Sequence, residues 1–311
     1  MPVIGEQRRY SAGRYAIELD GVTAGWIHSA EGGHASADVV VEKPGPDRVV
    51  HKHITGVKYE DITVTCGTGM SKSFYEWLTA TFDQKGVRKN GAIITADYEG
   101  KELSRLSFYN ALITEIDFPA PDASTKDMAK MAIKMTPEYT RRQISSGASL
   151  IEYRLGPTSQ QKWLPSNFRL TLAGLDCTRV NKIDAITVKQ QIVENPVGES
   201  RDYEKEPAYL EIPNLVVTLP ESSAQDFYDW HADFVINGNN GQDNEKNGTL
   251  EFLTPNLQGV LFSLTLKHLG IFKLSPENVN SGDEAIRRVR AEMYCEEMQL
   301  AYFEGAVGSV A

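Results

Sequence analysis

The sequence predicts a mainly β protein with one helix per domain, built as two tandem copies of one small domain. The segment Ser73–Trp77 (Ser-Phe-Tyr-Glu-Trp) recurs as Asp226–Trp230 (Asp-Phe-Tyr-Asp-Trp), 153 residues later in a chain of 311. A repeat of this kind decides the architecture. Outside these two segments, apolar and polar residues mostly alternate, which is typical of half-buried strands. Two domains of about 150 residues also fit the usual domain size.

The first copy is expected to begin with strands. Alternation of apolar and polar residues or short apolar runs predict strands at 14–20, 38–42 and 62–66, with Trp26 and Ile27 between the first two, and the stretch 49–57 could return as a hairpin arm. The segment Lys43–Asp47 (Lys-Pro-Gly-Pro-Asp) breaks the pattern with three strong turn residues. The strands on either side of this turn can therefore return on each other as a hairpin.

A helix follows the strand at 62–66. Ser73 and Glu76 fit the S-x-x-E capping box, with Ser71 as an alternative cap, and Gly86 is expected to end the helix. One apolar stripe is formed by Phe74, Trp77, Leu78 and Phe82.

Three further strand-like runs complete the first copy. They are Ala92–Tyr98, Leu103–Phe118 with a possible break near Asn110, and Ala129–Thr136, which Pro137 ends. Glu99-Gly100 is expected as the hairpin turn between the first two of them.

The second copy repeats this order of elements. We assign residues 1–143 to the first domain, 144–166 to a polar linker and 167–311 to the second domain. Strands are expected at 168–172, 183–188, 215–219, 250–253, 259–272 and 291–300, and a helix with the stripe Phe227, Trp230, His231 and Phe234. The match between the copies is weakest at Glu199–Tyr209, where residues 199–206 are acidic.

Composition excludes several classes of protein. The formal net charge is −10, with −1 over residues 1–150 (18 Lys and Arg, 19 Asp and Glu) and −9 over 151–311 (14 and 23). An acidic chain is not expected to grip nucleic acid through phosphates. An acidic surface would suit a conduit along which polyanions slide, although an ordinary acidic surface explains the charge equally well.

No apolar run approaches the roughly 18 residues of a membrane helix. The N-terminal sequence lacks the apolar core of a signal peptide, so assembly in a cytoplasm and no membrane insertion are expected. Cys66, Cys177 and Cys295 are far apart and odd in number, which favours buried free thiols.

Candidate sites for chemistry each have a simpler interpretation. His51 and His53 share one face of a strand and could hold a metal, but no third ligand is evident, so a surface hairpin is preferred. The segment Gly67–Ser73 lacks the spacing of a phosphate-binding loop and is expected as a turn before the helix. Glu76 and Asp229 are interpreted as acids in the first helical turn.

His231 is expected as a core or interface histidine. Neither a Ser-His-Asp nor a Cys-His set has local support in the sequence. We therefore assign no catalytic, cofactor-binding or metal-binding residue, expect no cofactor and do not expect an enzyme.

Three blocks of the first copy resemble a known family. They are KYEDITVTCGTGMSKSFYEWL, RLSFYNALITEIDFPAPDAS and MAIKMTPEYTR, beginning at residues 58, 105 and 131. In this order they closely resemble the tail-tube proteins of contractile phage tails and related bacterial injection systems. The resemblance covers nearly all of residues 1–143, whereas the second copy resembles the family only through the repeat.

The resemblance implies a small β-barrel or sandwich with one flanking helix. It also implies that six such domains form a ring around a lumen and that rings stack inside a sheath. Residues 43–57 match the ring-stacking hairpin, and residues 92–118 are candidates for the lumen wall. The partners expected are copies of the chain itself in hexameric or trimeric rings, sheath and baseplate or spike proteins, and DNA or protein cargo in the lumen.

The chain departs from the family pattern because it has two domains where a tube subunit has one. Either six chains make two stacked rings of domains, or three chains make one pseudo-sixfold ring, as in tube-initiator or baseplate-hub components. We expect a structural subunit of the tube, with the initiator or hub as the alternative. A carbohydrate-binding or enzymatic β-sandwich is the hypothesis from another class, but neither an acid pair nor an aromatic platform is evident.

Overall fold

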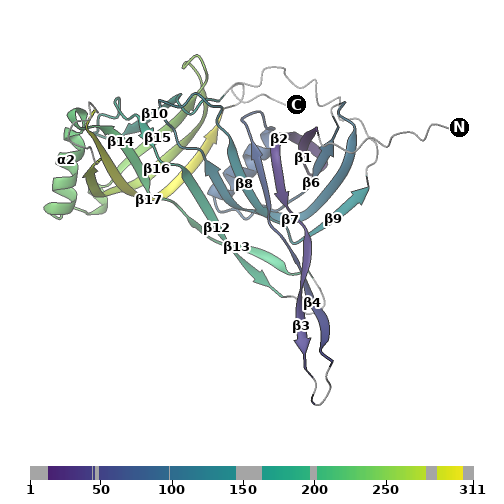
Figure 1. Ribbon diagram of the computed structural model, residues 1–311. Helices are drawn as coiled ribbons and strands as arrows, with labels where there is room; N and C mark the ends of the chain where they lie inside the picture. Colours follow the sequence, from purple (N-terminus) through teal and green to yellow (C-terminus); the bar gives the residue numbers. More distant parts are fainter. Residues whose placement is uncertain are drawn as a thin grey trace.

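The computed structural model describes residues 13–43, 45, 49–97, 99–144, 163–196, 202–277 and 286–303. These residues form two curved sheets that lie next to each other, and a long two-stranded hairpin that projects away from both (Figure 1). The prediction of a mainly β chain with one main helix in each copy is confirmed.

The first sheet closes into a six-stranded barrel. Its strands run in the order β7-β6-β1-β2-β5-β8, and β8 pairs back onto β7. The six are β1 (Arg14–Leu19), β2 (Val22–Gly32), β5 (Ile62–Cys66), β6 (Lys89–Ala96), β7 (Glu102–Phe118) and β8 (Met131–Thr136). A further strand, β9 (Tyr139–Ile144), continues along β7 beyond Pro137, where the sequence predicted an end.

The second sheet has the same cyclic strand order with one pairing missing. The order is β10-β15-β16-β17-β14-β11, so β10 and β11 occupy the places of β1 and β2 but do not pair. The strands are β10 (Phe168–Leu172), β11 (Lys182–Ile183), β14 (Leu215–Pro220), β15 (Lys246–Leu253), β16 (Val260–Pro276) and β17 (Arg288–Tyr302). This sheet is therefore a half-barrel, and the shared order confirms tandem domains of one fold.

The two copies also share their irregularities. Asn110 in β7 and His268 in β16 are both non-glycine residues at positive φ, 50° and 55°. Each donates its backbone N–H to the side-chain oxygen of an asparagine in the preceding strand, Asn90 at 2.9 Å and Asn247 at 3.0 Å. The break expected near Asn110 is thus a local bulge within a continuous strand, and it occurs in both copies.

Each helix covers its sheet with the predicted apolar stripe. Phe74, Trp77, Leu78 and Phe82 of α1 (Lys72–Phe82) are buried, as are Phe227, Trp230 and Phe234 of α2 (Gln225–His231) and its π-helical continuation (Ala232–Ile236). Short 3-10 turns occur at Glu221–Ser223 and Gln242–Asn244. The expected capping box is wrong, because Ser71 occupies the N-cap and Ser73 already lies within the helix.

One apolar core joins the two copies. The ring of Tyr75 in α1 stacks on Tyr302 in β17, with centroids 5.4 Å apart. Trp163 is 2% exposed and packs edge-on against Phe252 and Phe262. Trp163 lies within the segment assigned as a polar linker, so that segment ends in the core; residues 145–162 lie outside the described residues.

Two hairpins leave the barrels at equivalent places. The hairpin of β3 (Ala35–Glu42) and β4 (His51–Tyr59) forms a sheet of its own. The hairpin of β12 (Ile186–Asn195) and β13 (Glu204–Glu211) instead joins the first sheet through β7, which gives that sheet nine strands. Residues 204–206 of the acidic segment thus lie in a regular strand, and residues after the predicted boundary extend the sheet of the first copy.

Within the described residues, none of the helices is long and apolar enough to cross a membrane.

Candidate assembly interface

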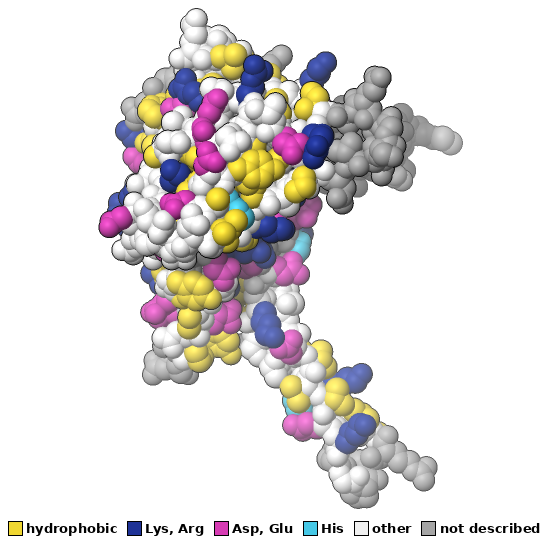
Figure 2. All heavy atoms as spheres, turned by 90° about the vertical axis from the view of Figure 1, so that its left-hand side faces the viewer, with side chains coloured by type: hydrophobic (Ala, Val, Ile, Leu, Met, Phe, Trp, Pro, Cys, Tyr) yellow, Lys and Arg dark blue, Asp and Glu magenta, His cyan; other side chains and the backbone are white. Residues whose placement is uncertain are grey.

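The β3–β4 hairpin exposes apolar side chains along its length. Val39, Val41 and Ile54 are 58%, 50% and 67% exposed. Figure 2 shows the hairpin as a narrow projection on which hydrophobic and charged side chains alternate. An isolated two-stranded hairpin is marginally stable in water, and its free edges can pair with another chain. These properties are typical of a segment that docks on a partner.

The β12–β13 hairpin already makes such a contact within the chain. Its first strand pairs antiparallel with the distal part of β7, so that Ile186 lies opposite Phe118 and Lys189 opposite Glu115. The hairpin therefore takes the edge of β7 beyond the point where β6 ends, since β6 pairs only as far as Ala111.

A polar clamp holds the second strand of this hairpin. Glu138 accepts the backbone N–H of Lys205 at 3.3 Å, and the Arg88 guanidinium donates to the Lys205 carbonyl at 2.7 Å. The side chain of Lys205 is 8% exposed, and its ammonium donates to the Thr136 hydroxyl at 2.6 Å. Asn110, the bulge residue of β7, donates its side-chain amide to Glu138 at 2.7 Å. Because both backbone groups and the ammonium of Lys205 are hydrogen-bonded to the first copy, these contacts hold the hairpin against the barrel.

A second polar contact lies near the base of the free hairpin. Tyr59 donates its hydroxyl hydrogen to Asp202 at 3.1 Å, and Arg141 donates to the Tyr59 hydroxyl oxygen at 2.7 Å. The guanidinium of Arg141 also lies over the ring of Tyr139, 4.9 Å from its centroid. The β3–β4 hairpin therefore leaves the molecule next to the docked hairpin, although its own outer part has no comparable support among the described residues.

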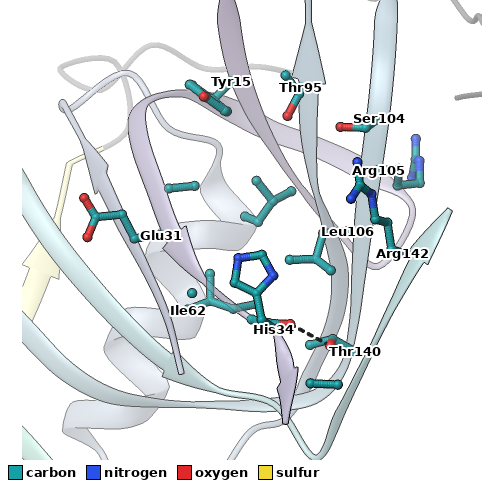
Figure 3. Close-up of a pocket in the computed structure, with 15 residues that line it drawn as sticks. Tyr15, Glu31, His34, Ile62, Thr95, Ser104, Arg105, Leu106, Thr140 and Arg142 are labelled. Atoms are coloured by element: carbon teal, nitrogen blue, oxygen red, sulfur yellow. Dashed lines mark hydrogen bonds between the residues drawn. The ribbon is translucent and has the colours of Figure 1, made fainter. Parts of the chain in front are cut away.

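A hollow of about 400 Å³ opens in the first barrel at the base of β3. In Figure 3 the imidazole of His34 lies inside it, and Arg105 and Arg142 lie on one wall. Arg105 is paired with Glu18 at 2.8 Å. Glu31 is the one carboxylate among the lining residues. The hollow consequently lacks the facing acid pair of a glycoside hydrolase.

The second copy carries an acidic cluster that the sequence did not reveal. Ligand atoms of Glu245, His268 and Glu296 lie within 4.8 Å of one another, a spacing that could hold a metal ion. Glu245 already accepts the Tyr294 hydroxyl and contacts the His268 ring, each at 2.8 Å. Burial, followed by the hydrogen bond to Glu245, raises the pKa of Tyr294 to about 12. The three cluster residues come from strands or loops far apart in sequence, so no local motif indicates them.

The histidines and acids singled out from the sequence do not converge on a site. His51 and His53 are exposed on β4, and His53 contacts Glu42 at 2.9 Å. His231 is half-buried at the end of α2. The interpretation of Glu76 and Asp229 as first-turn acids is wrong, because each is the fifth residue of its helix.

The predicted turn and the free thiols are confirmed. Residues 67–71 form the turn that leads into α1, and the Tyr75 hydroxyl donates to the Thr68 carbonyl at 2.9 Å. Cys66 and Cys295 are buried and Cys177 is half-buried, all without a disulfide.

A family model of known proteins matches most of the first copy. Residues 11–141 match the family model described as T4-like virus tail tube protein gp19. Comparison with curated proteins gives no match.

Solved structures similar to the chain include the anti-feeding prophage tube-terminating cap (20% identity over 46% of this chain and 97% of that one, TM-score 0.40). Others are a chain of the PVC extracellular contractile injection system sheath–tube complex (18%, 45% and 94%, TM-score 0.38) and Hcp1 from Flavobacterium johnsoniae (12%, 44% and 95%, TM-score 0.27). Residues 11–141, most of the first copy, thus match the T4-like virus tail tube protein family.

Proposed function

We propose that this chain is a structural subunit of the inner tube of a contractile phage tail or injection system, forming stacked rings around a lumen. The observation that carries the proposal is the tail tube family match over residues 11–141, in a chain whose second sheet repeats the strand order of the first. Because the second copy repeats that order, one chain supplies two building blocks of similar shape. The role is structural rather than catalytic, and no cofactor or metal takes part in it.

A tube-initiator or baseplate-hub trimer is the second candidate. It is favoured by the contact between the copies, in which β12 of the second copy extends the sheet of the first. If every pair of neighbouring domains in a ring were joined in this way, three chains would make a pseudo-sixfold ring. Six chains would instead build two stacked rings of domains.

The proposed partners are further copies of this chain, sheath proteins, and baseplate or spike proteins, with DNA or protein cargo in the lumen. Assembly takes place in the cytoplasm, without membrane insertion. Residues 92–118 line the lumen, and residues 43–57 make the contact between successive rings. The described part of residues 43–57 lies in the projecting hairpin, as that role requires.

Electron microscopy and mass determination of the purified chain test the proposal. Rings or tubes with a central lumen are expected, and the mass of one ring, as a multiple of the chain mass of 34.5 kDa, separates three chains from six. A chain that stays monomeric at every concentration and binds glycans or turns over a substrate would refute a tube role.

A further inference from the structure

We propose that the β3–β4 hairpin of one copy docks on the second domain of another copy, with Lys52 held at the Glu245–His268–Glu296 cluster. The inference rests on the proposed function only in requiring that copies of the chain assemble. Its geometry comes from the contact that the chain already makes between its own two halves.

The two hairpins are equivalent residue by residue. In β3–β4, Val41 lies opposite Lys52, and in β12–β13, Glu194 lies opposite Lys205. Each residue of the second pair is 153 positions after its counterpart in the first. Both hairpins also shift register at the same place, one step before Val39 in the first and before Ile192 in the second. Lys52 therefore occupies the position that Lys205 occupies in the docked hairpin.

The surfaces that would receive the hairpins are equivalent as well. Lys89 opposite Ala111 in the first copy corresponds to Lys246 opposite Leu269 in the second. The last strand follows the same shift, since Leu112 lies opposite Thr136 and Gly270 lies opposite Tyr294. By this correspondence the clamp residues of the first copy map onto the cluster of the second: Arg88 onto Glu245, Asn110 onto His268, Thr136 onto Tyr294 and Glu138 onto Glu296.

The receiving surfaces of the two copies differ in charge, and so do the two hairpins. Glu296 keeps the carboxylate with which Glu138 accepts the backbone N–H of the docked lysine. Glu245 replaces the cationic Arg88, so the receiving surface of the second copy is acidic. In the hairpin that it would receive, His51 and His53 flank Lys52 along the strand, in place of Glu204 and Glu206 beside Lys205, and the acid opposite His51, Glu42, contacts His53. Opposite charge at the contact favours this pairing and steers the encounter.

The edge next to the cluster is open. β15 pairs with β16 only as far as Leu269, and beyond it no described strand borders β16 on that side. The corresponding edge of β7 is the one that β12 occupies. Phe272, in the open part of β16, is 41% exposed. The base of β3 can therefore pair with Lys273 and Leu274 of another copy, as the base of β12 pairs with Glu115 and Ile116.

The hairpin and the cluster belong to different copies in this contact. Figure 1 shows the β3–β4 hairpin projecting away from the half-barrel of its own chain. The contact is therefore heterologous, with one surface on each partner, and such contacts build closed rings or open stacks. One contact of this kind is already made within each chain, so the proposed one would join the second domain to the next chain in the same way. It assigns Lys52 itself to this contact between neighbouring domains, while the rest of residues 43–57 keeps the proposed contact between successive rings.

Charge reversal and rescue test the contact in the full-length chain. Lys52→Glu is expected to raise the concentration for half-assembly by at least about tenfold, measured by sedimentation velocity. The double variant Lys52→Glu with Glu296→Lys restores the attraction and should recover most of that loss. Lys58→Glu is the matched control, because Lys58 is exposed on the same strand and its ion pair is with Asp38 of its own hairpin.

Carbodiimide cross-linking of a mixture of 14N and 15N chains supplies a direct readout. Mixed-isotope peptides that join Lys52 to Glu245 or Glu296 are expected. If the parent chain assembles and Lys52→Glu assembles equally well, the proposed contact is overturned while the tube role stands. If the parent chain does not assemble at all, the tube role itself fails. Loss of assembly in Lys52→Glu without rescue by the double variant, or with an equal loss in Lys58→Glu, also counts against the contact.

Discussion

Replacement of Glu138 by alanine should release the docked β12–β13 hairpin from the first barrel. The Glu138 carboxylate is 11% exposed and joins the Lys205 backbone N–H, the Asn110 amide and the Arg88 guanidinium. A hydrogen bond to a charged group contributes about 1.5–3 kcal/mol, and contributions within one network do not add fully. We discount the Arg88 pair, because its atoms are 3.8 Å apart and Arg88 is 38% exposed. The expected loss is about 2–3 kcal/mol.

Hydrogen exchange of the β13 amides measures this loss locally. A loss of 2–3 kcal/mol corresponds to a fall of roughly 30- to 150-fold in protection factor. The second copy supplies the control, since Glu296 stands at the equivalent position without a docked hairpin and is exposed. Glu296→Ala in the unassembled chain should change the protection factors of the β13 amides less than about threefold. Equal effects of the two substitutions would refute the clamp.

Three further predictions concern the barrels, the thiols and the free hairpin. Gly91→Ala and Gly248→Ala should each lower the melting temperature by at least about 5 °C, because the added Cβ would lie 2.1 Å or 2.5 Å from a backbone carbonyl oxygen. Gly241 has open space around it, so Gly241→Ala should leave the melting temperature unchanged. Equal melting temperatures for the three variants would contradict the close approach. Burial raises the pKa of the Cys66 thiol from its ordinary 9.0 to about 12. Between these two pH values the thiol of the unfolded chain has lost its proton, whereas the thiol of the folded chain keeps it. The free energy of unfolding therefore falls as pH rises, by about 1 kcal/mol at pH 10. Thermal unfolding from pH 7 to 10 should show a shallower decline in Cys66→Ala than in the parent chain, and parallel curves would argue against this cause. Deletion of residues 43–57 should leave folded chains that no longer stack, and tubes of normal length by electron microscopy would show that this segment is not the axial contact.

The elements that each copy forms on its own could be predicted from the sequence. The Phe-Tyr-acid-Trp segments exposed the duplication because both helices need the same apolar stripe to cover a sheet. Strands such as Ile62–Cys66 were predictable because alternate residues face the core. Local periodicity was sufficient wherever an element packs against its own domain.

The elements that depend on contacts far apart in sequence could not be predicted. β13 lies in the acidic segment where the repeat looked weakest, and its strand is defined by pairing with β12 and by the clamp at Glu138. Arg88 and Glu245 occupy equivalent positions in the two copies but carry opposite charges. Matching the copies by residue type therefore does not identify these two positions as equivalent. Ser71 rather than Ser73 is the N-cap of α1 because its own backbone N–H donates to the Ala24 carbonyl in β2 at 2.7 Å, a contact that the capping pattern does not report.

The unequal charge of the two halves gains a physical reason from the proposed contact. A β12–β13 hairpin placed on the second domain would bring Glu204 and Glu206 to the acidic cluster. A β3–β4 hairpin placed on the first domain would put Lys52 where Lys205 now lies beside Arg88, but with His51 and His53 in place of Glu204 and Glu206. Acids brought to an acidic cluster are costly, so the β12–β13 hairpin favours the first domain and leaves the second domain to the β3–β4 hairpin. Two copies with identical surfaces could associate in any order, whereas the exchanged charges make first and second domains alternate. The acidic excess of the second half, −9 against −1, includes Glu204, Glu206 and Glu245, the acids by which the proposed contact would fix the order of domains.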